Sequence, residues 1–275
     1  MTTNIAITGA CGFVGTALRD KFKKCTIIQR DDGEEEIRKK LKNIDVVINL
    51  AGAPIIKRWN TSHRVLLRKS RISRTKHLVN ALNKSDVKHF ISTSAIGIYP
   101  NDIMCSESCK KYSNDFLGNL VQDWEHEANK CNKPTTILRF GIILGEKGGA
   151  LVKMLLPFKL GIGGNIDNGK MMMSWIHMDD LLDMYDFIIK KELIGIFNAT
   201  SPNSVRNNNV FTKALGKVLN RPTFFPLPKI ILKIMYGEAS SVLIDSKDVY
   251  PQRILDEGFT FKYTNINTAL KQILL

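Results

Sequence analysis

The sequence predicts an α/β protein with a doubly wound parallel sheet and a small C-terminal lobe on the substrate side. Three observations support this fold class: β-branched runs alternate with helical patterns, each run is nearly all apolar, and a glycine-rich turn follows the first run. Strands of this composition are typical of a sheet that helices cover on both faces. We expect one compact unit, with the sheet domain at 1–150 and a mixed lobe at 151–275 whose excursions return to the sheet.

The expected elements follow in chain order. Short β-branched runs predict strands at 4–8, 26–29, 45–50, 89–94 and 135–140. Helical patterns lie between and after these strands, at 13–24, 60–84, 115–131 and 149–160. A glycine-rich segment at 160–177 then precedes a helix at 178–191, a strand at 194–199 and a helix at 207–219.

The interval between the second and third strands is unusually short. Residues 30–44 leave room for one helix but not for a helix and another strand. We therefore expect a sheet that is trimmed at this edge, and the shortened 31–44 segment should alter the outer wall of an adenine pocket.

The charge balance indicates anionic partners. Lys and Arg number 40 against 26 Asp and Glu, a net charge of +14 at pH 7. The densest basic segment, 57–77, spreads its cations over a helical period rather than interleaving them with aromatic side chains. This pattern favours a solvated helix face, or contacts to phosphates of a cofactor or substrate, over nucleic acid.

Two further classes of protein are disfavoured by composition. No apolar run approaches membrane-spanning length and the chain enters a strand directly, so we expect a cytoplasmic protein without a membrane partner. The five cysteines are odd in number and show no zinc pattern, which favours reduced thiols over disulfides or a metal site.

The glycine-rich turn is the strongest functional signal. The segment TGACGFVG places Gly9, Gly12 and Gly15 between the first strand and the first helix. Glycines at this spacing permit a tight turn, a close approach of the backbone to pyrophosphate and close packing of the helix, whose N-terminus faces the negative charge. The motif predicts dinucleotide binding, with a purely structural turn as the alternative.

The end of the second strand discriminates between dinucleotides. A carboxylate there would bind the ribose 2′-hydroxyl of NAD, whereas this chain has Gln29 and Arg30, and a guanidinium suits a 2′-phosphate. NADP(H) is therefore favoured over NAD(H), although Asp31 and Asp32 would reverse the preference if the turn bent differently.

The end of the third strand is the next expected cofactor contact. Leu50, Ala51 and Gly52 are small or apolar residues at the point where the cofactor ribose should pass. An ordinary buried strand end is the alternative interpretation.

These motifs carry a resemblance to a known family. The segments TGACGFVG, DVVINLAG, STSAIGIY, LRFGIILGEKGG and WIHMDDL together resemble the extended short-chain dehydrogenases/reductases. The segments NLAGAPIIKRW, SRISRT, DWE, GGALVKMLLPFKLGIGG and GEASSVL resemble more closely the YfcH-like family of nucleoside-diphosphate-sugar epimerases, over nearly the whole chain. The tail is similar to one that the family carries as a domain of unknown function.

The resemblance implies an NADP(H)-binding Rossmann fold with cofactor contacts at the matching positions. These positions are Gly9, Gly12, Phe13, Gly15, Gln29, Arg30, Leu50, Ala51 and Arg71.

The catalytic pair of the better-known relatives is missing. They use Tyr-x-x-x-Lys for proton transfer, with a Ser or Thr on the neighbouring strand that holds the substrate oxygen. Here Phe116 and Leu120 stand at the expected positions, and only the serine is retained, as Ser94. Tyr99 is the preferred replacement acid/base, and a loop tyrosine that packs against the lobe is the alternative.

Several other side chains have open roles. Lys57 and Arg58 would supply positive charge to a substrate; Arg139 would either form an internal ion pair or face the substrate. We expect His177 to be structural, and Asp179 and Asp180 to lie at a helix N-terminus. The Met171–Met173 run should form an apolar wall, with Trp59 and Trp175 lining the cavity mouth. Trp124 should lie in the core.

Two functions follow from the sequence. The first is an NADP(H)-dependent oxidoreductase or nucleoside-diphosphate-sugar epimerase that acts on a small polar or sugar-like substrate with Ser94 and Tyr99. The second is a non-catalytic NADP(H)-binding protein, structural or regulatory, that acts through a protein partner.

Overall fold

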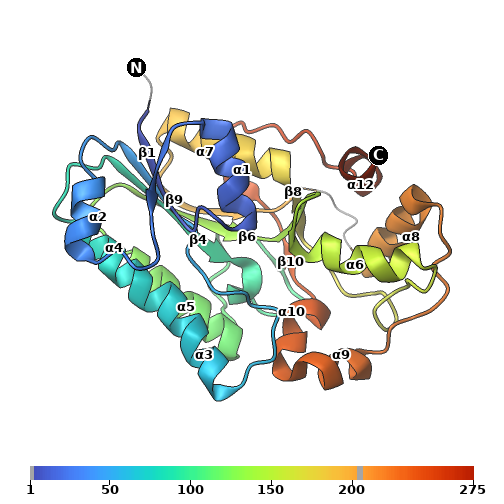
Figure 1. The fold of residues 1–275 in the computed structure, drawn as a ribbon. Coiled ribbons are helices and arrows are strands. Elements are labelled where there is room, and N and C mark those ends of the chain that lie inside the picture. Colours follow the sequence, from blue (N-terminus) through green and yellow to red (C-terminus); the bar gives the residue numbers. More distant parts are fainter. Residues whose placement is uncertain (1–2, 203–206) are drawn as a thin grey trace.

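A six-stranded parallel sheet organises the computed structural model, which describes residues 3–202 and 207–275 (Figure 1). The strand order is β2-β1-β3-β4-β6-β9, and every neighbouring pair in it is parallel. The strands are β1 (Ile5–Thr8), β2 (Cys25–Ile28), β3 (Val46–Asn49), β4 (His89–Ala95), β6 (Thr135–Phe140) and β9 (Gly195–Ala199). The predicted doubly wound parallel sheet is confirmed.

Helices cover both faces of the sheet, as the apolar strands predict. On one face, α1 (Phe13–Phe22) and α7 (Met178–Lys191) pack on alternate strand residues such as Ile5 and Ile7. On the other face, α2 (Glu34–Lys40), α4 (Arg74–Leu82) and α5 (Phe116–Ala128) lie against the intervening residues, such as Ala6.

The sheet ends at β2, so the predicted trimmed edge is confirmed. Only α2 lies between β2 and β3, and no further strand is present among the residues described there. This edge of the sheet is therefore bordered by the turn after β2 and by α2.

The basic segment 57–77 forms an interrupted helix. We expected one helix over 60–84; the chain instead forms α3 (Thr61–Arg68), a π-helical turn η1 (Lys69–Ser73) and α4. A π-helical turn changes the rotation of the side chains that follow it and is frequent at functional sites. Arg71 lies within this turn.

The C-terminal part builds a second core beside the carboxyl ends of the strands (Figure 1). Two small parallel pairs, β7–β8 and β5–β10, lie outside the main sheet. Further elements are β5 (Met104–Cys105), β7 (Ile142–Leu144), α6 (Gly149–Lys159), β8 (Trp175–His177), α8 (Asn208–Leu219), α9 (Lys229–Tyr236), η3 (Gly237–Ser240), α10 (Ser241–Ile244), β10 (Asp248–Val249), α11 (Gln252–Asp256) and α12 (Ile266–Leu274). The expected domain boundary at residue 150 stays a prediction, since β9 joins the main sheet from beyond it.

Within residues 3–202 and 207–275, no helix is both long and apolar enough to cross a bilayer.

Candidate functional site

The glycine-rich turn adopts the geometry that its sequence requires. Gly9 has φ +67, and a Cβ there would lie 2.8 Å from the backbone of Leu50. A Cβ on Gly15 would lie only 2.2 Å from Gly9 O, so the first helix can approach the turn only without a side chain. The Gly12 N–H donates to Gly9 O (3.0 Å), and α1 begins at Phe13 with no acidic residue in its first turn.

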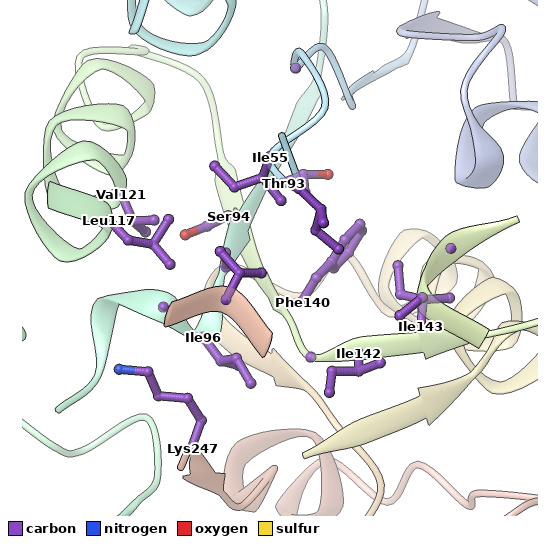
Figure 2. A pocket seen from close by; sticks show the side chains of 18 of the residues that line it. Ile55, Thr93, Ser94, Ile96, Leu117, Val121, Phe140, Ile142, Ile143 and Lys247 are labelled. Carbon is purple, nitrogen blue, oxygen red and sulfur yellow. The ribbon is translucent and has the colours of Figure 1, made fainter. Parts of the chain in front are cut away.

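A cavity of about 460 Å³ opens from this turn at the carboxyl ends of the strands, where ligands of such sheets bind. Its walls are mainly apolar (Figure 2). Of the predicted site residues, the following line it: Gly9, Gly12, Phe13, Gly15, Leu50, Gly52, Arg71 and Ser94.

Arg71 is an unusual charge in the wall of the cavity. Its Nη2 donates to Ala53 O (3.0 Å) and its guanidinium lies 5.4 Å from the centre of the Trp124 ring. Its Nη1 is buried and has no hydrogen-bond partner. Burial lowers the pKa of Arg71 to about 10. A partly buried cation without a carboxylate is costly, and an anion of a ligand would relieve that cost.

The turn after β2 exposes Arg30 and Asp31, whereas the Asp32 carboxylate is held internally. Asp32 Oδ2 accepts hydrogen bonds from Gln29 N and Lys40 Nζ, each at 2.6 Å. Burial alone would raise the pKa of Asp32, but these hydrogen bonds hold it below its usual value. Gln29 and Arg30 are exposed and lie outside the cavity lining, and Arg74 donates to the carbonyl oxygens of Gln29 and Asp32.

The end of β3 is tied to β1 through Thr8. Leu50 N and Ala51 N donate to Thr8 Oγ1 at 3.1 and 3.2 Å. Gly52 lies against Arg71, because a Cβ there would be 3.1 Å from Nη2. Ala51 is not among the residues that line the cavity. The cofactor contacts at this strand end stay predictions.

Helix α5 presents an apolar face where a Tyr-x-x-x-Lys pair would act. Its cavity-lining residues are Leu117, Leu120, Val121 and Trp124. Leu117 and Val121 project from α5 toward Ser94 and Ile96 in Figure 2. Phe116 instead packs on Trp59, with ring centres 5.0 Å apart.

Ser94 leads into a buried polar network. Its Oγ donates to Glu125 Oε1 at 2.5 Å, and Arg139 binds both Glu125 oxygens, from Nε (2.8 Å) and Nη2 (2.7 Å). Arg139 Nη1 also donates to Tyr99 Oη (2.7 Å), which donates to Asn198 Oδ1 (2.9 Å). Of the two roles open for Arg139, the structure therefore favours the internal ion pair.

Tyr99 lies outside the cavity lining. Burial raises the pKa of Tyr99 to about 12, although Arg139 acts against that rise. This placement does not favour the predicted role of Tyr99 as an acid/base. Ser94 does reach the cavity, but its proton is committed to Glu125, so it faces a ligand as a hydrogen-bond acceptor.

Two further titratable residues line the cavity, and sequence reasoning missed both. Lys247 Nζ donates to Tyr99 O (2.6 Å) and lies 4.0 Å from Asp245 Oδ2. Burial lowers the pKa of Lys247 and raises that of Asp245. Among the described lining residues, Arg71, Asp245 and Lys247 are the only titratable ones. No local motif marks Lys247, which reaches the cavity because the tail folds back across it (Figure 2).

The remaining candidates lie elsewhere. His177 caps α7, where its Nδ1 accepts from Asp179 N (3.1 Å), and its ring stacks on Tyr263. Trp59 and Trp175 are buried but do not line the cavity, whereas the Met171–Met173 run does. The residues that the structure describes contain no cluster of three or more His, Cys, Asp or Glu able to hold a metal ion.

Comparison with known families follows the chain closely. Residues 5–199 match the model of the NAD dependent epimerase/dehydratase family, and residues 227–273 match a domain of unknown function (DUF1731). An epimerase family protein of Staphylococcus epidermidis is 36% identical over 293 residues, covering 98% of each chain. A Staphylococcus aureus epimerase family protein is 37% identical over 295 residues, again covering 98% of each chain.

Solved structures share the fold. The human epimerase family protein SDR39U1 (isoform 2) with NADPH has a TM-score of 0.90 at 28% identity, covering 98% of this chain and 99% of that one. A nucleoside-diphosphate sugar epimerase from Corynebacterium glutamicum has a TM-score of 0.79 at 27% identity, covering all of this chain and 58% of that one.

Proposed function

The chain belongs to the NAD-dependent epimerase/dehydratase family, and we propose that it binds NADP(H) and acts as a reductase or nucleoside-diphosphate-sugar epimerase on a small polar or sugar-like compound. The observation that carries the proposal is Arg71, a cation with a buried, unpartnered nitrogen in a cavity that opens from a glycine-rich turn. The phosphates of a dinucleotide would supply the missing anion. A cytoplasmic location is part of the proposal.

The residues present fit this cofactor. Gly9, Gly12, Phe13 and Gly15 would surround the pyrophosphate, because a side chain at Gly9 or Gly15 would fill the space that the turn leaves. NADP(H) is preferred over NAD(H) because the Asp32 carboxylate is held by internal hydrogen bonds.

The Arg30 guanidinium is exposed in the same turn and would bind the 2′-phosphate. Gln29, Leu50, Ala51 and Gly52 would contact the riboses and adenine. When bound, the nicotinamide supplies or accepts a hydride.

The chain itself would supply the proton. A carbonyl that gains a hydride also needs a proton donor at its oxygen. We assign this role to Lys247, whose side chain contributes to the cavity wall and whose pKa is lowered by burial. Ser94 Oγ would accept a hydrogen bond from a substrate hydroxyl, since its own proton goes to Glu125. In the oxidative direction the neutral amine of Lys247 would take the proton back.

A second candidate function is a non-catalytic NADP(H)-binding protein that acts through a protein partner. The observation that favours it is the apolar inward face of α5, formed by Leu117, Leu120, Val121 and Trp124. Cofactor binding is common to both functions, so only turnover separates them.

The test is a paired fluorescence titration with NADPH and NADH on wild type and Arg30→Ala, with Arg221→Ala, a distant exposed arginine, as control. The proposal requires tighter binding of NADPH and a loss of that preference in Arg30→Ala alone. Absence of binding to either dinucleotide would refute it.

NADPH oxidation is then measured across aldehydes, ketones and 4-keto sugar nucleotides, and epimerase activity across nucleoside-diphosphate sugars with NADP⁺ or NADPH bound. Turnover in either assay supports the enzyme. Cofactor binding without turnover supports the second function.

A further inference from the structure

The exposed apolar side chains of this protein are concentrated on one face of the C-terminal lobe. Two segments, 152–162 and 221–235, form this apolar-cationic face. On α6, Val152, Leu156 and Leu160 form a stripe at helical spacing and are 41%, 66% and 65% exposed. Phe224 and Phe225 in the second segment are 82% and 59% exposed.

The two segments lie side by side. Ile166 pairs with Leu227 in a β-bridge, and Leu227 N donates to Asn165 O at 2.7 Å. A Cβ on Gly164 would lie 2.0 Å from Phe225 O, so the loop after α6 runs against the phenylalanine pair. The apolar-cationic face is therefore one surface built from both segments.

Helix α9, within the second segment, is amphipathic. Its buried side is anchored by Leu232, while Ile230 and Ile234 are 60% and 67% exposed. Lys233 lies between these isoleucines in sequence and is exposed. An isoleucine pair left in water on a helix with a buried anchor indicates an external partner for that side.

The charge of the face is uniformly positive. Residues 149–166 and 221–236 contain Lys153, Lys159, Arg221, Lys229 and Lys233 and no acidic residue. Asp167, which directly follows the first of these two ranges, is paired with Lys229 at 3.2 Å. A second copy of the chain would bring like charges together, whereas an anionic surface would neutralise them.

We propose that the apolar-cationic face docks on an anionic lipid membrane surface. The two exposed phenylalanines and the stripes of α6 and α9 enter the interfacial region, and the lysines reach the headgroups with their stems on the apolar residues. Such docking is peripheral and needs no spanning helix, so it agrees with the absence of one in the part of the chain that the structure describes.

Vesicle flotation tests this proposal, with phosphatidylcholine vesicles that contain or lack phosphatidylserine. Wild type should float with the anionic vesicles, and high salt should weaken the association. Lys153→Gln/Lys159→Gln/Lys233→Gln should lower the partition coefficient roughly 100-fold, as expected for three cations near an anionic surface. Ile230→Ser/Ile234→Ser should also release the protein.

Matched control variants replace exposed apolar residues and exposed lysines that lie outside the apolar-cationic face. Val65→Ser/Met104→Ser changes side chains that are 60% and 69% exposed, and Lys42→Gln/Lys110→Gln/Lys271→Gln removes three other exposed lysines. Both controls should bind like wild type.

Three results would overturn the proposal. The first is that wild type stays with the buffer, and the second is that the controls lose as much binding as the face variants. The third is a wild-type dimer that Ile230→Ser/Ile234→Ser dissociates, which would assign the face to a second copy.

Discussion

Arg71→Met should raise or preserve the stability of the ligand-free protein while it weakens NADPH binding. The burial that lowers the pKa of Arg71 from 12.5 to about 10 corresponds to at most roughly 3 kcal/mol against the charged form. The variant regains that cost but loses the hydrogen bond to Ala53 O and the contact with Trp124, each worth about 1 kcal/mol. The net change in the free energy of unfolding is therefore about 1 kcal/mol in favour of the variant.

NADPH affinity should move in the opposite direction. A charge-assisted hydrogen bond contributes about 1.5–3 kcal/mol, so its loss raises the Kd roughly 10- to 150-fold. Urea unfolding of the ligand-free protein and a fluorescence titration with NADPH measure the two quantities.

Arg68→Met, one turn earlier at the exposed ion pair with Asp123, should change neither quantity by much. A large destabilisation of Arg71→Met together with unchanged NADPH affinity would show that Arg71 is structural and refute the reasoning.

Three further predictions concern the chemistry, the buried network and the turn after β2. Lys247→Met should keep the Kd for NADPH within about twofold of wild type while steady-state NADPH oxidation is lost, since the proposed proton donor is removed from outside the cofactor-binding turn. Glu125→Gln should lower the free energy of unfolding in urea by about 3 kcal/mol, because Arg139 stays buried without its ion pair. Asp32→Asn should cost stability at neutral pH but not in acid. The folded-state pKa of Asp32 lies below its ordinary 3.8, so its contribution is present above that value and is lost as the pH falls through the folded-state pKa.

Each of these three variants has a control variant in which a residue of the same type is changed at another position. Lys271→Met removes an exposed lysine from α12 and should leave NADPH oxidation unchanged. Glu127→Gln breaks an ion pair with Lys130, which is half-exposed. This change should lower the free energy of unfolding by less than about 1 kcal/mol. Asp31→Asn alters the exposed neighbour of Asp32 and should leave the pH dependence of unfolding as in wild type. A control that behaves like its partner variant would contradict the corresponding assignment.

The sheet could be predicted because its signals are local. β-branched runs, a glycine-rich turn at the first strand end and the short interval after β2 each lie within a few residues, and the alternation of strands with helices predicts a parallel sheet. The π-helical turn at Lys69–Ser73 could not be predicted, because the periodicity of 60–84 is compatible with an unbroken helix.

Parts of the site could be predicted for the same reason. Arg71 was assigned by the resemblance, and Arg74, three residues later on the same helical segment, could have been found from that spacing. The partnership of Ser94, Glu125 and Arg139 joins three separate elements, and nothing in any one of them reveals it. The same holds for Asp32. From the sequence its carboxylate could bind a ribose, but in the fold it accepts a hydrogen bond from Gln29 N.

The position of Lys247 in the cavity wall could not be predicted from the sequence, and it gives the C-terminal tail a role in the proposed reaction. The inward face of α5 is occupied by packing, with Trp124 beneath Arg71, so this helix has no position left for a proton donor. In the proposed enzyme the catalytic group would then have to come from another wall, and within the described lining only the tail provides a lysine. If Lys247 is the donor, the domain of unknown function completes the active site, and the epimerase/dehydratase part that ends at residue 199 would bind the cofactor but lack the means to protonate a substrate.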